Sequence, residues 1–141
     1  MKKTILILVI IISCFECKKD SLNDTDLLKT KWILSYIQDT KTQAITNYPS
    51  DATKKISIIF NDTSGISFSG ICNGGAGTYT YSSITGEIKV TDLGTTLIWC
   101  KYVEWETYTV QSLHYASSYK INGNNLAIYT GGAYNLHFTR N

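Results

Sequence analysis

Proline occurs once in the 141 residues, and charged residues make up 17% of the chain against 43% hydrophobic ones. Disordered chains show the opposite bias, toward proline and charge, because they bury too little apolar surface to fold. The composition therefore indicates a packed globule. A chain of this length has room for one core and for no second domain.

The chain also lacks a basic stripe. Its formal net charge of +2 comes from 13 basic and 11 acidic residues, and removing Lys2 and Lys3 leaves 11 of each. The remaining basic residues are scattered along the sequence, so no cluster of cations is expected to neutralise a phosphate backbone. We therefore expect no nucleic-acid partner.

Catalytic and metal-binding motifs are missing as well. Neither G-x-S-x-G nor H-E-x-x-H occurs, and His114 and His137 are lone histidines in different predicted elements. No second C-x-x-C and no histidine pair completes a set of four zinc ligands. The sequence predicts a protein that is not an enzyme and that holds neither a metal nor a cofactor.

No apolar run is long enough to span a membrane. The run Thr4–Ile12 is too short for a helix that crosses a hydrocarbon layer of about 30 Å. It follows two lysines and is therefore typical of the hydrophobic region of a signal peptide. We interpret residues 1–13 as a signal peptide that is removed from the mature protein.

The end of this signal resembles the lipobox of bacterial lipoproteins, in the sequence Ile11-Ile12-Ser13-Cys14. We predict that Cys14 is lipidated. Cys17 is the alternative, because the residues after it also resemble a lipoprotein start, but Glu16 before it fits the signal peptidase poorly. Residues 14–24 would form a polar tether, and the two chains of a diacylglyceryl group anchor a protein stably. The resemblance implies a cell-envelope protein on the outer membrane, outside the cytoplasm.

The rest of the chain is patterned for strands. Tyrosine, threonine, isoleucine and tryptophan favour half-buried strands, and the Gly, Asn, Asp and Ser residues between apolar runs are typical of turns. Strands are predicted at residues 32–37, 55–60, 65–70, 77–81, 87–90, 119–121, 126–129 and 134–138. Asn122-Gly123 is the strongest hairpin signal. We expect a mainly β (α+β) fold, a small antiparallel meander or barrel-like sheet.

One stretch breaks this pattern, because residues 101–116 contain neither glycine nor proline. Four residues recur there at helical spacing: Val103, Glu106, Val110 and Leu113. The spacing predicts one helix in the C-terminal half. Glu106 shares the apolar face and is expected to point inward, with Glu104 toward solvent.

An ordered set of short motifs runs through the predicted domain. They are Gly70-Ile71-Cys72-Asn73, Gly77-Thr78-Tyr79, Thr95-Thr96-Leu97-Ile98-Trp99-Cys100, Glu104 with Glu106, and Ser118-Tyr119-Lys120-Ile121-Asn122-Gly123-Asn124-Asn125-Leu126. With the early Trp32 and Leu34, the set resembles the META domain, also called the HslJ-like family, over residues 25–141. Two departures from the family pattern are Trp99, in place of a small residue, and Gly74-Gly75, in place of bulkier ones.

The resemblance implies a compact, mainly β envelope domain that is loosely associated with stress tolerance and has no enzymatic activity. We expect a monomeric structural or interaction module whose partner is another envelope protein or peptide. The alternative is a small-ligand or glycan binder that uses a barrel mouth or an aromatic rim of Trp99, Tyr102 and Trp105. A filled interior with an exposed apolar patch would favour the protein partner.

Cys72 and Cys100 are the cysteines left outside the leader region. Outside the cytoplasm, two cysteines that meet in space oxidise. A bridge that closes a loop of roughly 30 residues would stabilise the fold by roughly 3 to 4 kcal/mol. Two buried reduced thiols are the alternative, and the compartment favours the disulfide.

Asn73 and Glu106 are candidate structural polar residues. A buried carboxylate needs hydrogen-bond donors, and the backbone N–H groups of the loop near Asn73 are candidates for them. An acid or base role for Glu106 would need a catalytic partner, which no motif supplies. We therefore expect the structural role.

Overall fold

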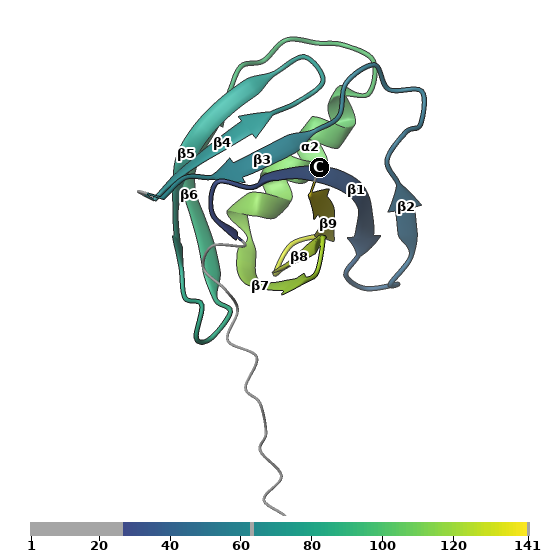
Figure 1. Ribbon diagram of the computed structural model, residues 1–141. Helices are drawn as coiled ribbons and strands as arrows, with labels where there is room; N and C mark the ends of the chain where they lie inside the picture. Colours follow the sequence, from purple (N-terminus) through teal and green to yellow (C-terminus); the bar gives the residue numbers. More distant parts are fainter. Residues whose placement is uncertain (1–26, 63, 141) are drawn as a thin grey trace, which may run out of the picture.

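The described residues form one continuous antiparallel sheet with a single long helix (Figure 1). The computed structural model describes residues 27–62 and 64–140. In chain order the elements are β1 (Lys31–Asp39), β2 (Ile45–Asn47), β3 (Ser57–Phe60), β4 (Gly65–Ser69), β5 (Gly74–Tyr81), β6 (Ile88–Thr95), α2 (Val103–His114), β7 (Ala116–Asn122), β8 (Asn125–Thr130) and β9 (Tyr134–Arg140). The predicted signal peptide 1–13, the tether 14–24 and both candidate anchors, Cys14 and Cys17, lie outside the described residues.

The order of the strands across the sheet is β6-β5-β4-β3-β1-β9-β8-β7, and β2 pairs with β1. The two outermost strands approach each other at one end. There the Tyr119 N–H donates to the Gly86 carbonyl at 2.7 Å, and Glu87 forms a bridge with Ser118. The sheet is therefore a curled half-barrel, which confirms the predicted mainly β fold.

Every second side chain along the strands points to the inside of this half-barrel and fills it. Along β4, Ile66 and Phe68 are buried while Ser67 and Ser69 are exposed, as expected where successive side chains point to opposite faces. The largest fully buried side chains include Trp32, Phe60, Tyr79 and Phe138. The interior is therefore packed with side chains.

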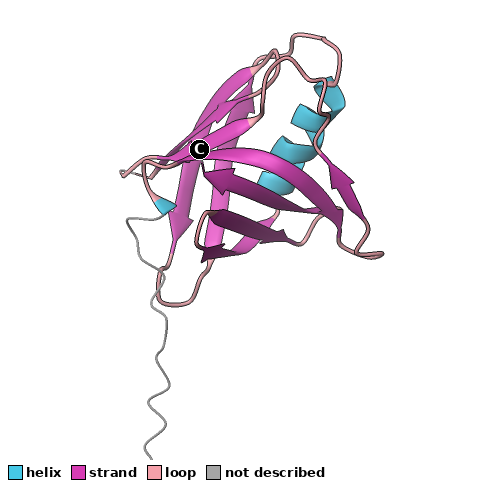
Figure 2. Cartoon of the chain, turned by 45° about the vertical axis from the view of Figure 1, so that its right-hand side comes forward, coloured by secondary structure: helices cyan, strands magenta, loops and turns pink. Residues whose placement is uncertain are grey.

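The helix α2, the long cyan helix in Figure 2, packs against β6, β8 and β9. Its buried residues are Trp105, Glu106, Thr109, Ser112 and Leu113. Of the four residues predicted to face inward, Glu106 and Leu113 do so, whereas Val103 and Val110 are half-buried at the edge of the face. The face is rotated because Trp105 also enters the core. Within the part of the chain described here, no helix is long and apolar enough to cross a membrane.

The predicted hairpin of β7 and β8 is confirmed, with its turn one residue further along. Asn122 pairs with Asn125, so the turn consists of Gly123 and Asn124. Gly123 has a φ of 56°, a left-handed conformation that glycine adopts without steric cost because it has no Cβ.

The described chain enters the fold beside the turn between β3 and β4, which we call the entry end. The Lys29 N–H donates to the Phe60 carbonyl at 2.7 Å. From there β4 runs from Gly65, near the entry end, to Ser69 at the other end of the sheet. Figure 1 shows that the connection from β6 to α2 lies at this other end, away from the point where the chain enters.

Candidate functional site

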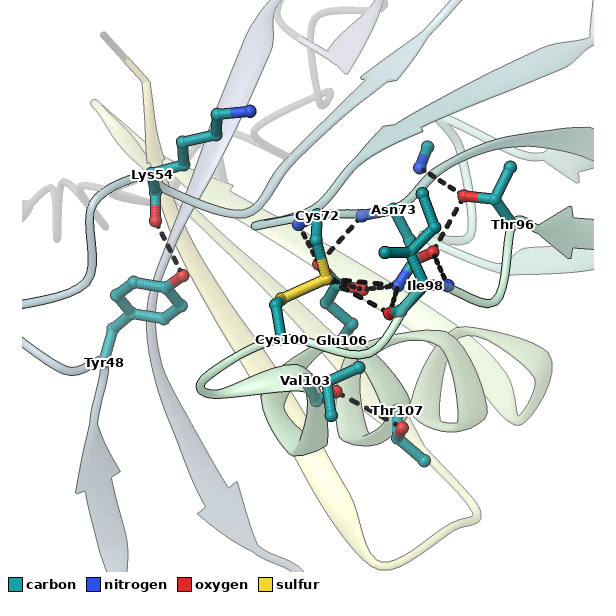
Figure 3. The surroundings of a disulfide bond; sticks show 11 residues. Tyr48, Lys54, Cys72, Asn73, Thr96, Ile98, Cys100, Val103, Glu106 and Thr107 are labelled. Carbon is teal, nitrogen blue, oxygen red and sulfur yellow. Dashed lines mark hydrogen bonds between the residues drawn. A yellow bond between two sulfur atoms is a disulfide. The ribbon is translucent and has the colours of Figure 1, made fainter.

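A disulfide joins two connections at the end of the sheet opposite the entry end. Cys72 lies between β4 and β5, Cys100 lies between β6 and α2, and their sulfur atoms are bonded (Figure 3). The predicted disulfide is confirmed, and the alternative of two reduced thiols is wrong. A bridge across 28 residues stabilises a fold by roughly 3 to 4 kcal/mol in the chain-entropy model.

The carboxylate of Glu106 lies next to this disulfide, and Glu106 is only 4% exposed. Its Oε1 accepts the N–H of Cys72 at 2.8 Å and the N–H of Asn73 at 3.2 Å. Its Oε2 accepts the Asn73 Nδ2 at 2.6 Å. Three bonds to a charged acceptor offset the cost of removing it from water. The structure thus places Glu106 against the loop from which the sequence analysis expected its donors to come.

The side-chain amide of Asn73 uses its full hydrogen-bonding capacity (Figure 3). Besides its bond to Glu106, Nδ2 donates to the Ile98 carbonyl at 2.8 Å. Oδ1 accepts the Ile98 N–H at 2.7 Å and the Thr96 hydroxyl at 2.8 Å. An asparagine amide has two N–H donors and one oxygen with two lone pairs. Asn73 therefore pairs with the backbone of Ile98 as a neighbouring strand would.

Gly70 makes room for this network. Its N–H donates to the Asn73 carbonyl at 2.7 Å, which closes the turn after β4. A Cβ at this position would meet Glu106 Cδ at 2.6 Å and the Asn73 carbonyl oxygen at 2.9 Å, both closer than van der Waals contact. Three residues of the Gly-Ile-Cys-Asn motif thus have a structural role. Gly70 leaves room for Glu106, Cys72 forms the disulfide, and Asn73 binds the backbone of Ile98.

Residues 96–100, which we call the clamped loop, are held at several points. Asn73 binds Thr96 and Ile98, and the disulfide holds Cys100. The apolar side chains of this loop nevertheless face solvent: Leu97 is 96% exposed, Trp99 is 84% exposed and Ile98 is 57% exposed. Burying one such side chain is worth about 1.5–3 kcal/mol. The loop therefore combines a fixed backbone with a large unburied apolar surface.

A groove of about 340 Å³, which we call the α2 groove, lies between the clamped loop and α2. Its walls come from these two segments: Leu97, Ile98 and Trp99 on one side, Val103, Thr107, Val110 and Gln111 on the other. The helical wall residues lie on one face because residues three and four apart are neighbours on a helix. Glu106 and Asn73 form part of the lining, so the hydrogen-bond network borders the groove.

The predicted aromatic rim does not form as a unit. Trp105 is 7% exposed and packs in a T-shaped contact on Tyr48, with ring centroids 5.3 Å apart. Tyr102 is half-buried and donates its hydroxyl to Asp51 Oδ2 at 2.6 Å, a bond that lowers the pKa of Asp51. Of the three residues only Trp99 lies open at the surface, because positions so close in sequence point to different sides of the helix start.

The histidines lie apart from this network. His114 is exposed at the end of α2, His137 belongs to β9, and neither lines the α2 groove. Cys72 Sγ, Cys100 Sγ and a Glu106 oxygen lie within 4.8 Å of one another. A cysteine binds metal as a thiolate, however, and the disulfide leaves no thiolate here. Glu106 is therefore the only one of these three that offers a ligand atom.

The sequence analysis did not single out Leu97 as a candidate site residue, and it assigned Val103 and Val110 to the core. A signal for the clamped loop was nevertheless present. Leu97, Ile98 and Trp99 are consecutive apolar residues outside any predicted strand. A loop cannot turn three consecutive side chains toward the core, so some of them are expected to be exposed.

The fold and the site together define a class of protein: a small antiparallel half-barrel in which a buried glutamate and a disulfide hold an exposed apolar loop. The chain belongs to the META domain family, since the family's model matches residues 25–141. This confirms the resemblance that the ordered motifs indicated.

Several solved structures are similar to this chain. The NMR structure of a protein from Burkholderia xenovorans has a TM-score of 0.67 and 19% identity, and the match covers 83% of this chain and 85% of that one. The crystal structure of a DUF4847 family protein from Bacteroides vulgatus has a TM-score of 0.64 and 14% identity, with 82% and 94% covered. These identities support a shared fold alone. No match to a curated protein was found.

Proposed function

We propose that this protein is a lipoprotein of the bacterial envelope, anchored through Cys14, that acts as a non-enzymatic interaction module. Its clamped loop and α2 groove bind another envelope protein. The proposal includes the link to envelope stress tolerance that the resemblance to the META family implies.

The observation that carries the proposal is an exposed apolar loop with a fixed backbone. Leu97 and Trp99 are 96% and 84% exposed, while Ile98 between them is bonded to Asn73 through both its N–H and its carbonyl. A surface that is ordered before binding loses less conformational entropy when the partner arrives. Aromatic and other apolar anchors of this kind carry much of the energy of protein interfaces.

The packed interior favours this proposal over a ligand in the barrel mouth. Trp32, Phe60 and Phe138 are fully buried inside the curled sheet. They occupy the volume that a ligand inside a barrel would need. The exposed apolar surface lies outside this core, on the clamped loop.

The position of the chain entry also supports an interaction module. The Trp32 Nε1–H donates to the carbonyl of Leu27, the first described residue, at 3.1 Å, and the Lys29 N–H donates to the Phe60 carbonyl at the entry end. An anchor that precedes Leu27 would hold the domain by this end. The clamped loop, at the other end (Figure 1), would stay accessible to a partner.

Metabolic labelling with a lipid precursor tests the anchor. We expect Cys14→Ala to lose the label and Cys17→Ala to keep it. The reverse pattern would move the anchor to Cys17, and an unlabelled wild-type protein would reject the lipoprotein assignment.

Photo-crosslinking in the native envelope tests the interaction. A photoreactive amino acid in place of Leu97 should give a discrete protein adduct in an intact-mass measurement. The matched control is the same replacement at Ile84, which is 83% exposed on the turn between β5 and β6 and should give no adduct. Equal adducts at both positions, no adduct, or a small-molecule adduct would contradict the proposal.

A further inference from the structure

The chemistry of the α2 groove indicates what a partner must present. Resting on the proposed function, we propose that the partner contributes an extended segment with apolar side chains, flanked by lysine or arginine, that lies in the α2 groove beside the end of β6. Three features of the described residues lead to this occupant: a strand edge, two apolar walls and an exposed glutamate, Glu104, beside the groove.

The strand edge comes from β6, which is an outermost strand of the sheet, and its last residue, Thr95, lines the groove. The Thr96 N–H is directed toward β5, since it donates to the Gly74 carbonyl at 3.0 Å. Successive residues of an antiparallel strand direct their backbone groups to alternate sides. The N–H and carbonyl of Thr95 therefore point away from β5, and an extended segment can pair with such an edge by adding a strand.

The two walls of the groove suit the side chains of such a segment. Leu97 and Trp99 stand on one side, and Val103 and Val110 stand on the other. Alternate side chains of an extended chain point to opposite faces. One face of the segment can therefore enter the groove of about 340 Å³ while the other face remains in water.

The charge beside the groove indicates which residues should flank the bound segment. Among the described residues that line the groove there is no lysine, arginine or histidine. Glu104 is exposed on α2, one turn before Thr107 of the helical wall, whereas the nearby Lys101 forms an ion pair with Asp51 at 3.0 Å. An exposed glutamate beside a groove that has no cationic lining residue attracts lysine and arginine and opposes contact with an anionic lipid surface.

The N-terminal segment of the chain itself does not fit this description. The described chain begins at the entry end, at the opposite end of the sheet from the groove. The segment of residues 14–26 has four acidic and two basic residues, and its large apolar side chains are limited to Phe15, beside the predicted anchor, and Leu22. It therefore lacks the apolar run and carries more acidic than basic residues, and the occupant is a separate chain.

A fluorescence titration with two synthetic peptides tests the inference. The protein is the full mature chain with Cys14→Ser, which needs no detergent. One peptide alternates valine or leucine with threonine and ends in lysines, and the other is identical but ends in aspartates. We expect the lysine peptide to bind about tenfold or more tightly than the aspartate peptide, and Glu104→Lys to reverse the preference.

Matched variants locate the binding. Leu97→Asn should weaken the lysine peptide about tenfold or more, while Ile84→Asn, at an equally exposed position, should leave its affinity unchanged. Equal affinity for both peptides, or no binding of either at about 1 mM, would overturn the inference.

Two further outcomes would assign the groove to another occupant and would also overturn the inference. They are Leu97-dependent binding to vesicles of phosphatidylethanolamine and phosphatidylglycerol, and Leu97-dependent self-association in sedimentation velocity. A protein adduct at position 97 in the native envelope would still support the proposed function in any of these cases. The failure of the inference and the failure of the proposed function are therefore distinguishable.

Discussion

At the scale of single residues, Asn73 joins three segments of the chain: its own turn, α2 and the clamped loop. Asn73→Asp removes both side-chain donors and brings a second carboxylate against Glu106, whose Oε2 lies 2.6 Å from Nδ2 in the native protein. We expect the free energy of unfolding in urea to fall by about 2–4 kcal/mol, because buried acceptors lose their donors and two like charges meet.

Two variants serve as controls for this prediction. Adding Glu106→Gln to Asn73→Asp should recover part of the loss, because a glutamine amide can donate to the new carboxylate. Asn124→Asp, in the exposed turn between β7 and β8, should change stability by less than about 0.5 kcal/mol. If Asn73→Asp and Asn124→Asp have the same effect, the network does not hold the loop.

His137 makes stability depend on pH. It stacks on Tyr36 with ring centroids 4.2 Å apart, and burial lowers its pKa below the ordinary value of 6.5. Near neutral pH the histidine is uncharged in both the folded and the unfolded chain. As the pH falls through 6.5, the unfolded chain takes up a proton first, so stability falls until the pH passes the folded pKa.

We therefore expect the wild-type protein to be less stable at about pH 5 than at about pH 7.5, with a slope of at most about 1.4 kcal/mol per pH unit for one proton. The paired carboxylates Asp51 and Asp62, whose pKa values are lowered from 3.8, stay ionised across this window. Urea unfolding at both pH values should show a smaller difference in His137→Gln and an unchanged one in His114→Gln. An unchanged difference in His137→Gln would assign the effect to other groups.

At the scale of elements, the disulfide ties the connection between β4 and β5 to the connection between β6 and α2. Replacing Cys72 and Cys100 together by serine should lower the free energy of unfolding by roughly 3 to 4 kcal/mol. It should also speed proteolytic cleavage within residues 96–100, because hydrogen bonds, chiefly those of Asn73, then hold the loop without a covalent link. Limited proteolysis under native conditions measures this, and an unchanged cleavage rate would show that the bridge does not restrain the loop.

The elements that the sequence predicts well are those with local signals. The hairpin of β7 and β8 depends on Gly123 and its neighbours, and helical spacing within residues 101–116, a stretch without glycine or proline, predicts α2. The helix face was predicted less accurately, because Val103 and Val110 have helical spacing but meet the groove, while the core takes Trp105. Spacing indicates one side of a helix but cannot show how the helix is rotated against a sheet.

The site, too, was predictable from the sequence only in part. A buried carboxylate at position 106 needs donors, and this requirement alone suggests a loop such as the one at Asn73. The bonds from Asn73 to Ile98 join residues 25 positions apart, and no local pattern predicts such a contact. The exposure of Leu97 and Trp99 also depends on the path of the loop, so it had to come from the structure.

At the scale of the whole molecule, the packed interior leaves binding to the outside of the half-barrel. The chain enters beside Phe60 at one end, and the clamped loop lies at the other. A protein held at its entry end and exposing Leu97 and Trp99 at the far end is arranged to reach a partner rather than to enclose a ligand. The central claim is therefore that the clamped loop is as rigid as the sheet that supports it.

The most direct test of this claim is NMR relaxation of the backbone amides across the whole domain. The account predicts order parameters for Leu97, Ile98 and Trp99 near those of the strands, about 0.85, and slow exchange of the Ile98 amide, which is bonded to Asn73 Oδ1 at 2.7 Å. Order parameters below about 0.6 at these positions, with a rapidly exchanging Ile98 amide, would show a flexible loop and contradict the account.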